Sequence, residues 1–117
     1  MSTQEVFDRH LRHQLEGDLD AILSDYAPDA VAATPEGIGA GHDYIRKVYE
    51  QVLPLLSSIE LTPTAHGQGD IIYLTFRGYR DGKVALLGTD TFVIRDDLIQ
   101  MHTFYAHAPS PNLDDGS

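Results

Sequence analysis

The chain has 117 residues, of which 18 are acidic and 8 are basic, so its formal net charge is -10. A chain of this length forms one domain that removes roughly two-thirds of its unfolded surface from water, enough to fold without cross-links. The negative charge repels phosphate, and the few basic residues form no stripe, so we expect no nucleic-acid partner. The hydrophobic content of 42% argues against intrinsic disorder.

Targeting and redox signals are absent from the sequence. It contains no cysteine, which excludes disulfides and thiolate metal sites. The first residues lack the basic and apolar segments of a signal peptide, and no apolar run approaches the roughly 18 residues of a membrane span. We therefore expect a cytoplasmic protein that does not enter a membrane.

The N-terminal segment has the pattern of a helical hairpin. Ser2 and Glu5 have capping-box spacing, and apolar residues follow at helical steps until Gly17, which predicts a first helix over this stretch. Asp18 then begins a second, shorter helix, which includes Tyr26 and ends before the proline that follows.

The middle of the chain predicts a short strand, a loop and a third helix. Residues 30–34 are apolar and lie between turn signals, whereas residues 35–41 are rich in Gly and Pro and predict a loop. Helical spacing resumes at His42 and is expected to end near Leu53, because Pro54 follows.

The second half changes to the period of β-strands. An Asp-Gly pair at 81–82 predicts a hairpin, and residues 95–97 form another turn. The predicted strands cover residues 59–64, 70–80, 83–94 and 98–107. Helices followed by an antiparallel meander indicate an α+β fold with helices on one face of a curved sheet. Residues 108–117 are expected to form a flexible tail.

One carboxyl lies where an apolar side chain is expected. Side chains alternate between the faces of a strand, and in the strand 83–94 one face is apolar except for Asp90. A buried carboxyl has to find donors, stay protonated or line a cavity. The alternative is a different register, in which Asp90 faces solvent or another subunit. We assign the other 17 acidic residues to caps, turns, helix surfaces or the tail.

Three further polar side chains point toward the same interior. His10 lies on the apolar face of the first helix, and Tyr26 and Tyr49 close the apolar stripes of the second and third. Each has an ordinary structural explanation, since buried histidines and tyrosines commonly serve packing and need only one hydrogen-bond partner. Together with Asp90 they have the pattern of a small polar site inside an apolar pocket.

Both sides of the last strand are mixed in polarity. Met101, Thr103 and Tyr105 share one side, and we expect them to form pocket walls together with Phe76. A sheet that is partly apolar on both faces favours a homodimer through one face. No histidine spacing matches a metal-binding motif, so we expect neither a metal nor another cofactor.

Several segments carry a family resemblance that extends from Val6 to His107. They are Gly17-Asp18-Leu19-Asp20, Tyr26-Ala27-Pro28-Asp29-Ala30, Gly41 with Ile45 and Tyr49, Gly88-Thr89-Asp90-Thr91-Phe92, and 101–105. In these the chain resembles the nuclear transport factor 2-like superfamily, which includes ketosteroid isomerase and the SnoaL-like polyketide cyclases. The resemblance implies one domain over residues 1–107, cone-shaped, with N-terminal helices packed in the concave face of a curved, mostly antiparallel sheet. It implies no single reaction, because this superfamily hosts isomerases, cyclases, dehydratases, epoxide hydrolases and non-catalytic binding modules.

The resemblance also implies roles for individual residues. Asp90 falls where ketosteroid isomerases keep the protonated acid of their oxyanion hole, and Tyr26 and Tyr49 fall where some of them have supporting tyrosines. His10 replaces the oxyanion tyrosine. Thr34 occupies the position of the general base and cannot accept a proton near neutral pH, which argues against the steroid-isomerase mechanism.

The leading hypothesis is an enzyme in which Asp90 and His10 share general acid-base work on a small, hydrophobic, carbonyl-containing ligand. The reaction would be of the isomerase, cyclase or dehydratase type, with Tyr26 and Tyr49 orienting the reacting groups and Thr34 in the binding wall. The alternative is a binding or dimerisation module that performs no reaction, which the missing base at Thr34 favours. A third possibility is a pocket filled by its own side chains, in a domain that only mediates self-association.

Overall fold

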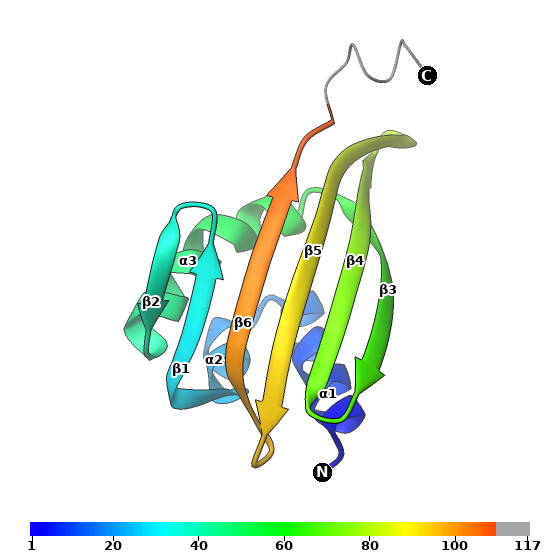
Figure 1. Ribbon diagram of the computed structural model, residues 1–117. Helices are drawn as coiled ribbons and strands as arrows, with labels where there is room; N and C mark the ends of the chain where they lie inside the picture. Colours follow the sequence, from blue (N-terminus) through cyan, green and yellow to red (C-terminus); the bar gives the residue numbers. More distant parts are fainter. Residues whose placement is uncertain (110–117) are drawn as a thin grey trace.

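Three helices cover one face of a six-stranded sheet in the computed structural model, which describes residues 1–109 (Figure 1). All but the first two residues of the predicted tail therefore lie outside the described residues. The helices and strands are α1 (Thr3–Glu16), α2 (Leu19–Ser24), β1 (Tyr26–Thr34), β2 (Gly37–Ala40), α3 (His42–Leu56), β3 (Glu60–Gln68), β4 (Ile71–Arg80), β5 (Lys83–Arg95) and β6 (Leu98–His107). Within residues 1–109, no helix is long and apolar enough to cross a membrane.

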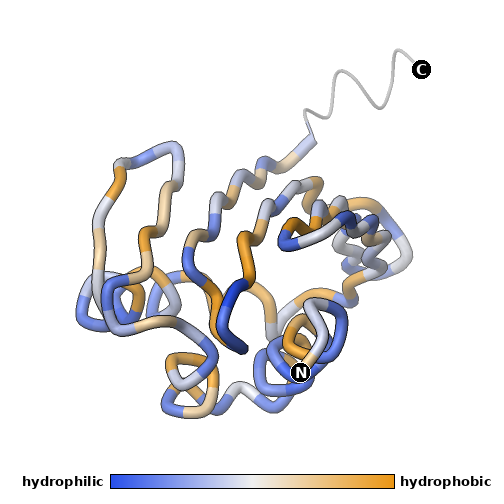
Figure 2. Tube along the Cα trace, turned by 60° about the horizontal axis from the view of Figure 1, so that its bottom comes forward, coloured by the Kyte–Doolittle hydropathy of each residue, from blue (hydrophilic) through white to orange (hydrophobic). Residues whose placement is uncertain are grey.

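The sheet is curved and mostly antiparallel, as predicted. Its strand order is β2-β1-β6-β5-β4-β3, and only the β1–β6 pair is parallel. The helices and the strands form two separate layers, and apolar segments, orange in Figure 2, occur in both. Fifteen buried residues from both layers make the core, which includes Val6 and Phe7 of α1 and Phe92 of β5. The predicted α+β class is therefore confirmed.

The start of α1 follows the capping signals. The Glu5 amide donates to Ser2 Oγ at 3.1 Å, and the Ser2 amide donates to Glu5 Oε1 at 2.9 Å, so the box is closed in both directions. Gly17 ends the helix in the left-handed conformation, with φ of 68°. Such a conformation strains residues with a Cβ, which explains why glycine stands at this position.

The predicted ends of the second and third helices were wrong. The second helix stops at Ser24, so Tyr26 lies on β1 and not on α2. Asp25 ends the helix because its buried side chain and its backbone have partners elsewhere: its carbonyl accepts from the Ile99 amide at 2.8 Å. The third helix runs to Leu56, because Pro54 lies in its last turn and removes only one backbone hydrogen bond there.

The Gly- and Pro-rich loop predicted over residues 35–41 was also wrong. Residues 37–40 form β2, which pairs with residues 31–34 of β1 as a hairpin. Gly39 allows this hairpin to lie against α3, because a Cβ at this position would overlap the ring of Tyr44. The glycines therefore permit close packing here and do not break the strand.

The inward face of β5 is the one that the sequence predicted. Leu86, Gly88, Asp90, Phe92 and Ile94 are all buried and alternate with partly exposed residues. Gly88 is required at its position, since a Cβ there would overlap the ring of Phe76 from the neighbouring β4. Asp90 thus lies in the middle of the buried face, between the helices and the sheet.

Candidate active site

A cavity of about 170 Å³ lies between the helices and the sheet. Its walls are mainly apolar and come from α1, α3 and all strands except β2. Leu11, Ile45, Val48, Leu74, Phe92 and Phe104 are among them. Asp90, Tyr26, Tyr49 and His102 are joined by hydrogen bonds and form the main polar region, and Thr34 and Gln14 add a hydroxyl and an amide to the wall. The cavity is therefore an apolar space with one concentrated polar region.

Asp90 has one oxygen held and the other open. Oδ2 lies 2.6 Å from His102 Nε2, and both side chains are buried. Oδ1 has no hydrogen-bond partner among the described residues. Every fully buried side-chain oxygen of those residues has a partner, so Oδ1 is not fully buried. Since Asp90 lines the cavity, Oδ1 is the atom that a bound molecule can reach.

His102 is held in place from two sides. The ring of Phe92 stacks on it, with centroids 4.0 Å apart and planes 22° apart. Its Nδ1 lies 2.7 Å from the Tyr26 hydroxyl, so both ring nitrogens have a partner. This fixes the direction in which the imidazole points Nε2 at Asp90.

The two tyrosines extend this contact into the core. The Tyr26 and Tyr49 hydroxyls lie 2.6 Å apart, and Tyr49 Oη lies 3.1 Å from His10 Nε2. His10 Nδ1 in turn lies 3.1 Å from Asp25 Oδ2. Three elements, α1, β1 and α3, and the residue after α2 are joined in this way behind the cavity.

Asp25 is the most heavily hydrogen-bonded carboxylate of the described chain. Oδ1 accepts from Arg9 Nε at 2.7 Å, and Oδ2 accepts from His13 Nδ1 at 2.8 Å in addition to His10. The side chain is fully buried, yet Arg9 and His13 reach toward the surface. Because its partners are held by α1, Asp25 fastens this helix to the start of the sheet.

The surroundings shift the pKa values of Asp25, His10 and the two tyrosines in different directions. Burial raises the pKa of Asp25, but the hydrogen bonds from His10, His13 and Arg9 outweigh it, and the net pKa is lowered. Burial lowers the pKa of His10, which is only partly offset by Asp25. Burial also raises the pKa of Tyr49 and Tyr26, the latter strongly. At neutral pH, therefore, Asp25 is ionised, His10 is neutral and both phenols keep their protons.

The structure brings most of the predicted site residues together. Asp90, Tyr26, Tyr49 and the predicted wall residues Thr34 and Phe76 all line the cavity. His10 belongs to the same hydrogen-bonded group, but it lies behind the tyrosines, is fully buried and does not contact Asp90. The direct pairing of His10 with Asp90 is therefore corrected: the partner of Asp90 is His102.

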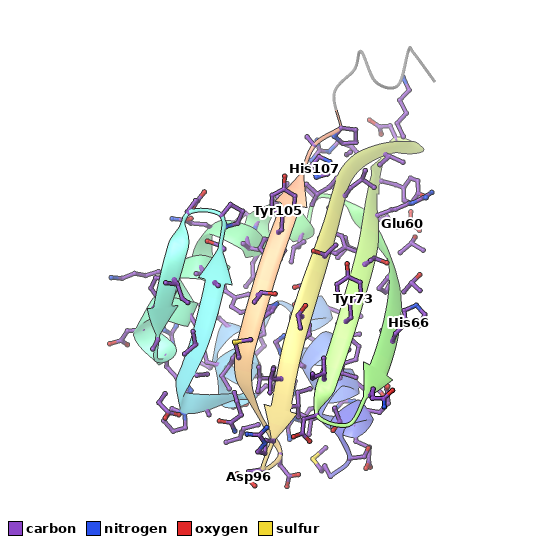
Figure 3. All side chains as sticks on the ribbon, viewed as in Figure 1. Glu60, His66, Tyr73, Asp96, Tyr105 and His107 are labelled. Atoms are coloured by element: carbon purple, nitrogen blue, oxygen red, sulfur yellow. The ribbon has the colours of Figure 1, made fainter. Side chains whose placement is uncertain are left out.

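Three predicted wall residues lie on the wrong face of the sheet. Met101 and Tyr105 are 37% and 50% exposed, and Thr103 lies between them on the same outward side of β6. Figure 3 shows Tyr105 on the face turned away from the helices. The inward positions of β6 are instead His102 and Phe104, which line the cavity.

Two residues of the candidate site were not predicted from the sequence. His102 shares its predicted strand face with Phe104, and this apolar neighbour was the available signal. Asp25 precedes Tyr26 and was assigned to a turn or surface, although it is fully buried. Within residues 1–109, no three His, Cys, Asp or Glu side chains are arranged to hold a metal ion.

Comparisons with known proteins agree with this architecture. Residues 7–102 match the model of the SnoaL-like domain. An NTF-2 like protein of unknown function from Burkholderia xenovorans is 17% identical, with a TM-score of 0.73 over 97% of this chain and 91% of that one. A candidate polyketide cyclase from Sinorhizobium meliloti is 19% identical, with a TM-score of 0.71 over 89% of this chain and 99% of that one.

A designed protein has the same fold, which shows that structural similarity of this kind does not indicate a function. A de novo protein with a curved β-sheet is 14% identical and has a TM-score of 0.73 over 99% of this chain and 93% of that one. At these identities, the similarity concerns the fold alone. No curated protein matches the sequence.

Proposed function

The chain belongs to the family of SnoaL-like domains, and from this premise we propose that it is an enzyme that moves protons on a small carbonyl compound. The observation that carries the proposal is the Asp90 carboxyl, whose Oδ2 is paired with His102 while Oδ1 opens into an apolar cavity. A carboxyl in this setting can take a proton from carbon and return it to another atom, as general acid-base catalysis requires.

The cavity walls favour an uncharged ligand. Neither Lys nor Arg is among the described lining residues, and Asp90 is the only carboxyl there. An anionic substrate would be buried beside a carboxyl without a cation to pair with, which is costly. A carbonyl compound with an apolar body matches both the walls and the polar region.

The volume favours a small ring. A dry cavity of about 150 Å³ admits benzene, and this one measures about 170 Å³. A single six-membered ring with a carbonyl oxygen therefore fits within the enclosed space, whereas larger substituents would extend toward the mouth. The rim there is apolar and includes Leu15, which is 83% exposed.

Roles can be assigned to each polar group. Asp90 is the proposed catalytic residue, since its free oxygen can touch the substrate. His102 holds the other oxygen and shares its proton. Tyr26 and Tyr49 keep their hydroxyl protons because burial raises the pKa of both, so they serve as hydrogen-bonding groups and not as bases.

Exchange of carbon-bound hydrogen tests the proposal. In D2O, the protein should accelerate the replacement of the acidic C–H hydrogens of cyclohex-2-enone by deuterium, followed by ¹H NMR. Asp90→Asn should reduce the catalysed rate about 100-fold or more, because a positioned acid-base group contributes that much. Asp96→Asn is the matched control: Asp96 lies in the exposed β5–β6 turn in a left-handed conformation that Asn tolerates.

The competing function is a binding module that performs no reaction. The single carboxyl of the cavity favours it, since Thr34 lines the wall where a second acid-base group would stand. In that case, ¹H NMR would detect binding of cyclohex-2-enone without deuterium incorporation. Undiminished exchange in Asp90→Asn would also overturn the role of this residue, provided that the variant is folded.

A further inference from the structure

A continuous chain of five hydrogen bonds joins the cavity to a fully buried carboxylate on the other side of the core. Its members are, in order, Asp25, His10, Tyr49, Tyr26, His102 and Asp90. We infer that Asp25 is a positioning residue that, through this chain, keeps a proton on His102 Nδ1 and leaves one shared proton between His102 Nε2 and Asp90. Its importance for catalysis rests on the proposed function, whereas the placement of the protons does not.

The first step is that Asp25 can only accept. Arg9 donates to Oδ1 at 2.7 Å, and an arginine in a protein is always charged, so Asp25 stands as a carboxylate beside it. His13 lies 2.8 Å from Oδ2 and donates as well. The contact between Oδ2 and His10 Nδ1 then requires a proton on that nitrogen. The tautomer of His10 is thereby set by Asp25.

The second step passes from His10 to the two phenols. His10 is completely buried and neutral, since its burial opposes a charge, so Nε2 carries a lone pair. Tyr49 must therefore donate its only proton to His10 at 3.1 Å. In the 2.6 Å hydrogen bond between the two hydroxyls, Tyr26 is then the donor and Tyr49 the acceptor.

The third step fixes His102. Tyr26 donates its single proton to Tyr49, so it can only accept from His102. The proton of the 2.7 Å hydrogen bond between Tyr26 and His102 is therefore on His102 Nδ1. One proton remains for the 2.6 Å contact between His102 Nε2 and Asp90 Oδ2. It lies on either side of that contact, as imidazolium with carboxylate or as imidazole with acid.

This arrangement explains how one carboxyl can serve as both acid and base. Moving the shared proton between Nε2 and Oδ2 changes the proton affinity of Oδ1, the oxygen open to the cavity. Because His102 Nδ1 is committed to Tyr26, the ring cannot turn into the other neutral tautomer, which would leave Asp90 as a permanent carboxylate. Through the chain, Asp25 thus keeps one shared proton between His102 and Asp90.

The test reads the proton on His102 directly. Long-range ¹H–¹⁵N correlation spectra distinguish a protonated ring nitrogen from an unprotonated one, without any substrate. In the unaltered protein, His102 Nδ1 should be protonated. In Tyr49→Phe, the Tyr26 proton is released to donate to His102, so Nδ1 should lose its proton and Nε2 should keep one facing Asp90.

A second variant reaches the same point from the end of the chain. Asp25→Asn replaces an acceptor by an amide that can donate to His10 Nδ1. Donor and acceptor can then exchange roles in each contact from His10 to His102. His102 Nδ1 should again become unprotonated. Tyr44→Phe, on the same helix as Tyr49 but outside the chain, and Asp96→Asn should leave the His102 signals unchanged.

The outcomes separate this inference from the proposed function. An unprotonated Nδ1 in the unaltered protein, or a proton that stays on Nδ1 in folded Tyr49→Phe, would overturn the inference even if cyclohex-2-enone exchange depends on Asp90. The predicted loss of that proton, in a protein that exchanges no ketone hydrogens, would support the inference and remove the enzymatic function.

Discussion

Asp25 and Asp90 are both buried carboxyls, but their surroundings differ in kind. Asp25 accepts from three side-chain donors, and its net pKa is lowered below the ordinary range although burial alone would raise it. Asp90 has one partner and a free oxygen at an apolar cavity. A saturated carboxylate is a fixed charge, whereas an unsaturated one can exchange protons with a ligand. The two ends of one hydrogen-bonded chain therefore differ: Asp25 is a fixed charge, and Asp90 is the end at which we propose proton exchange.

His10 predicts a pH dependence of stability. Its pKa is lowered in the folded protein by burial, so below pH ~6.5 the unfolded chain binds a proton there that the folded chain does not. The free energy of unfolding should therefore fall as the pH is lowered from ~6.5, with a contribution of up to about 1.4 kcal/mol per pH unit. Asp25 adds no slope in this window. Its lowered pKa contributes stability that is present at neutral pH and is lost only as the pH falls below the ordinary pKa of an aspartate.

The measurement compares urea unfolding of the protein with that of His10→Gln between pH 7 and pH 5. The variant keeps a hydrogen-bonding side chain but cannot titrate, so its stability should decline less steeply with falling pH. His66→Gln, an exposed histidine on β3, should retain the original slope. Equal slopes for the protein and His10→Gln would contradict the assignment of a neutral, buried His10.

At the scale of elements, a β-bulge decides which residues of β6 reach the cavity. Ile94 pairs with Ile99, but the next partner of Val93 is Met101, so Gln100 is an extra residue in β6. The extra residue turns the following side chains to the opposite face. If Gln100 paired with Val93 in a regular ladder, Met101 would lie opposite Phe92 and point inward, and His102 would point outward.

This bulge marks the boundary of what the sequence could predict. The uninterrupted alternation of β5 identified its inward face and Asp90, because the period alone decides the face there. On β6, both sides are mixed in polarity, so the pattern gives no sign of one inserted residue, and the wall residues were assigned to the wrong side. Asp25 was missed for another reason: its donors come from α1, and tertiary contacts of this kind leave no periodic signal.

Deletion of Gln100 should remove the bulge without moving the rest of β6. Ile99 would still face Ile94, and Met101 and His102 would follow directly opposite Val93 and Phe92, so that His102 stays in the cavity and Met101 stays outside it. We expect a loss of about 1 kcal/mol of unfolding free energy, because the main interaction removed is the side-chain hydrogen bond of Gln100. Cyclohex-2-enone exchange should be retained.

The matched control for this deletion is Gln100→Ala. It keeps the length of the strand and removes only the side-chain bond from Gln100 to the Arg95 carbonyl, which is 2.7 Å long. The cost should stay near 1 kcal/mol, because one partly exposed hydrogen bond is lost. Urea unfolding of the two variants measures both losses, and a much larger loss in the deletion would contradict the assignment of Gln100 as the extra residue.

At the scale of the whole molecule, the outward face of the sheet differs from the rest of the surface. The outward residues of the three adjacent strands β4, β5 and β6 include Ile71, Tyr73, Thr75, Arg77, Leu87, Thr89, Thr91, Val93, Met101, Thr103, Tyr105 and His107. None of these is Asp or Glu, although the chain has 18 acidic residues and a net charge of -10. Tyr73 and Tyr105 lie on this face in Figure 3, and Glu60 lies at its edge.

Such a face can meet a copy of itself without repulsion between carboxylates. We propose that the chain forms a homodimer through these outward residues, since threonines and half-exposed aromatic rings can pack against each other across a twofold axis. Most of the carboxylates lie on the rest of the surface, where contacts between copies bring like charges together, which is unfavourable. The helical layer stays outside the interface, so each cavity would keep its own mouth.

Thr91→Glu tests this arrangement, because Thr91 lies between Tyr73 and Thr103 in the middle of the face. Sedimentation should find a dimer for the unaltered protein and a monomer for the variant, with a dissociation constant raised by about 100-fold or more, since juxtaposed like charges cost several kcal/mol. Leu15→Glu, at an exposed position on α1 beside the cavity mouth, should remain a dimer. A monomeric unaltered protein, or a Thr91→Glu variant that still dimerises, would mean that the carboxylate-free face does not join two copies.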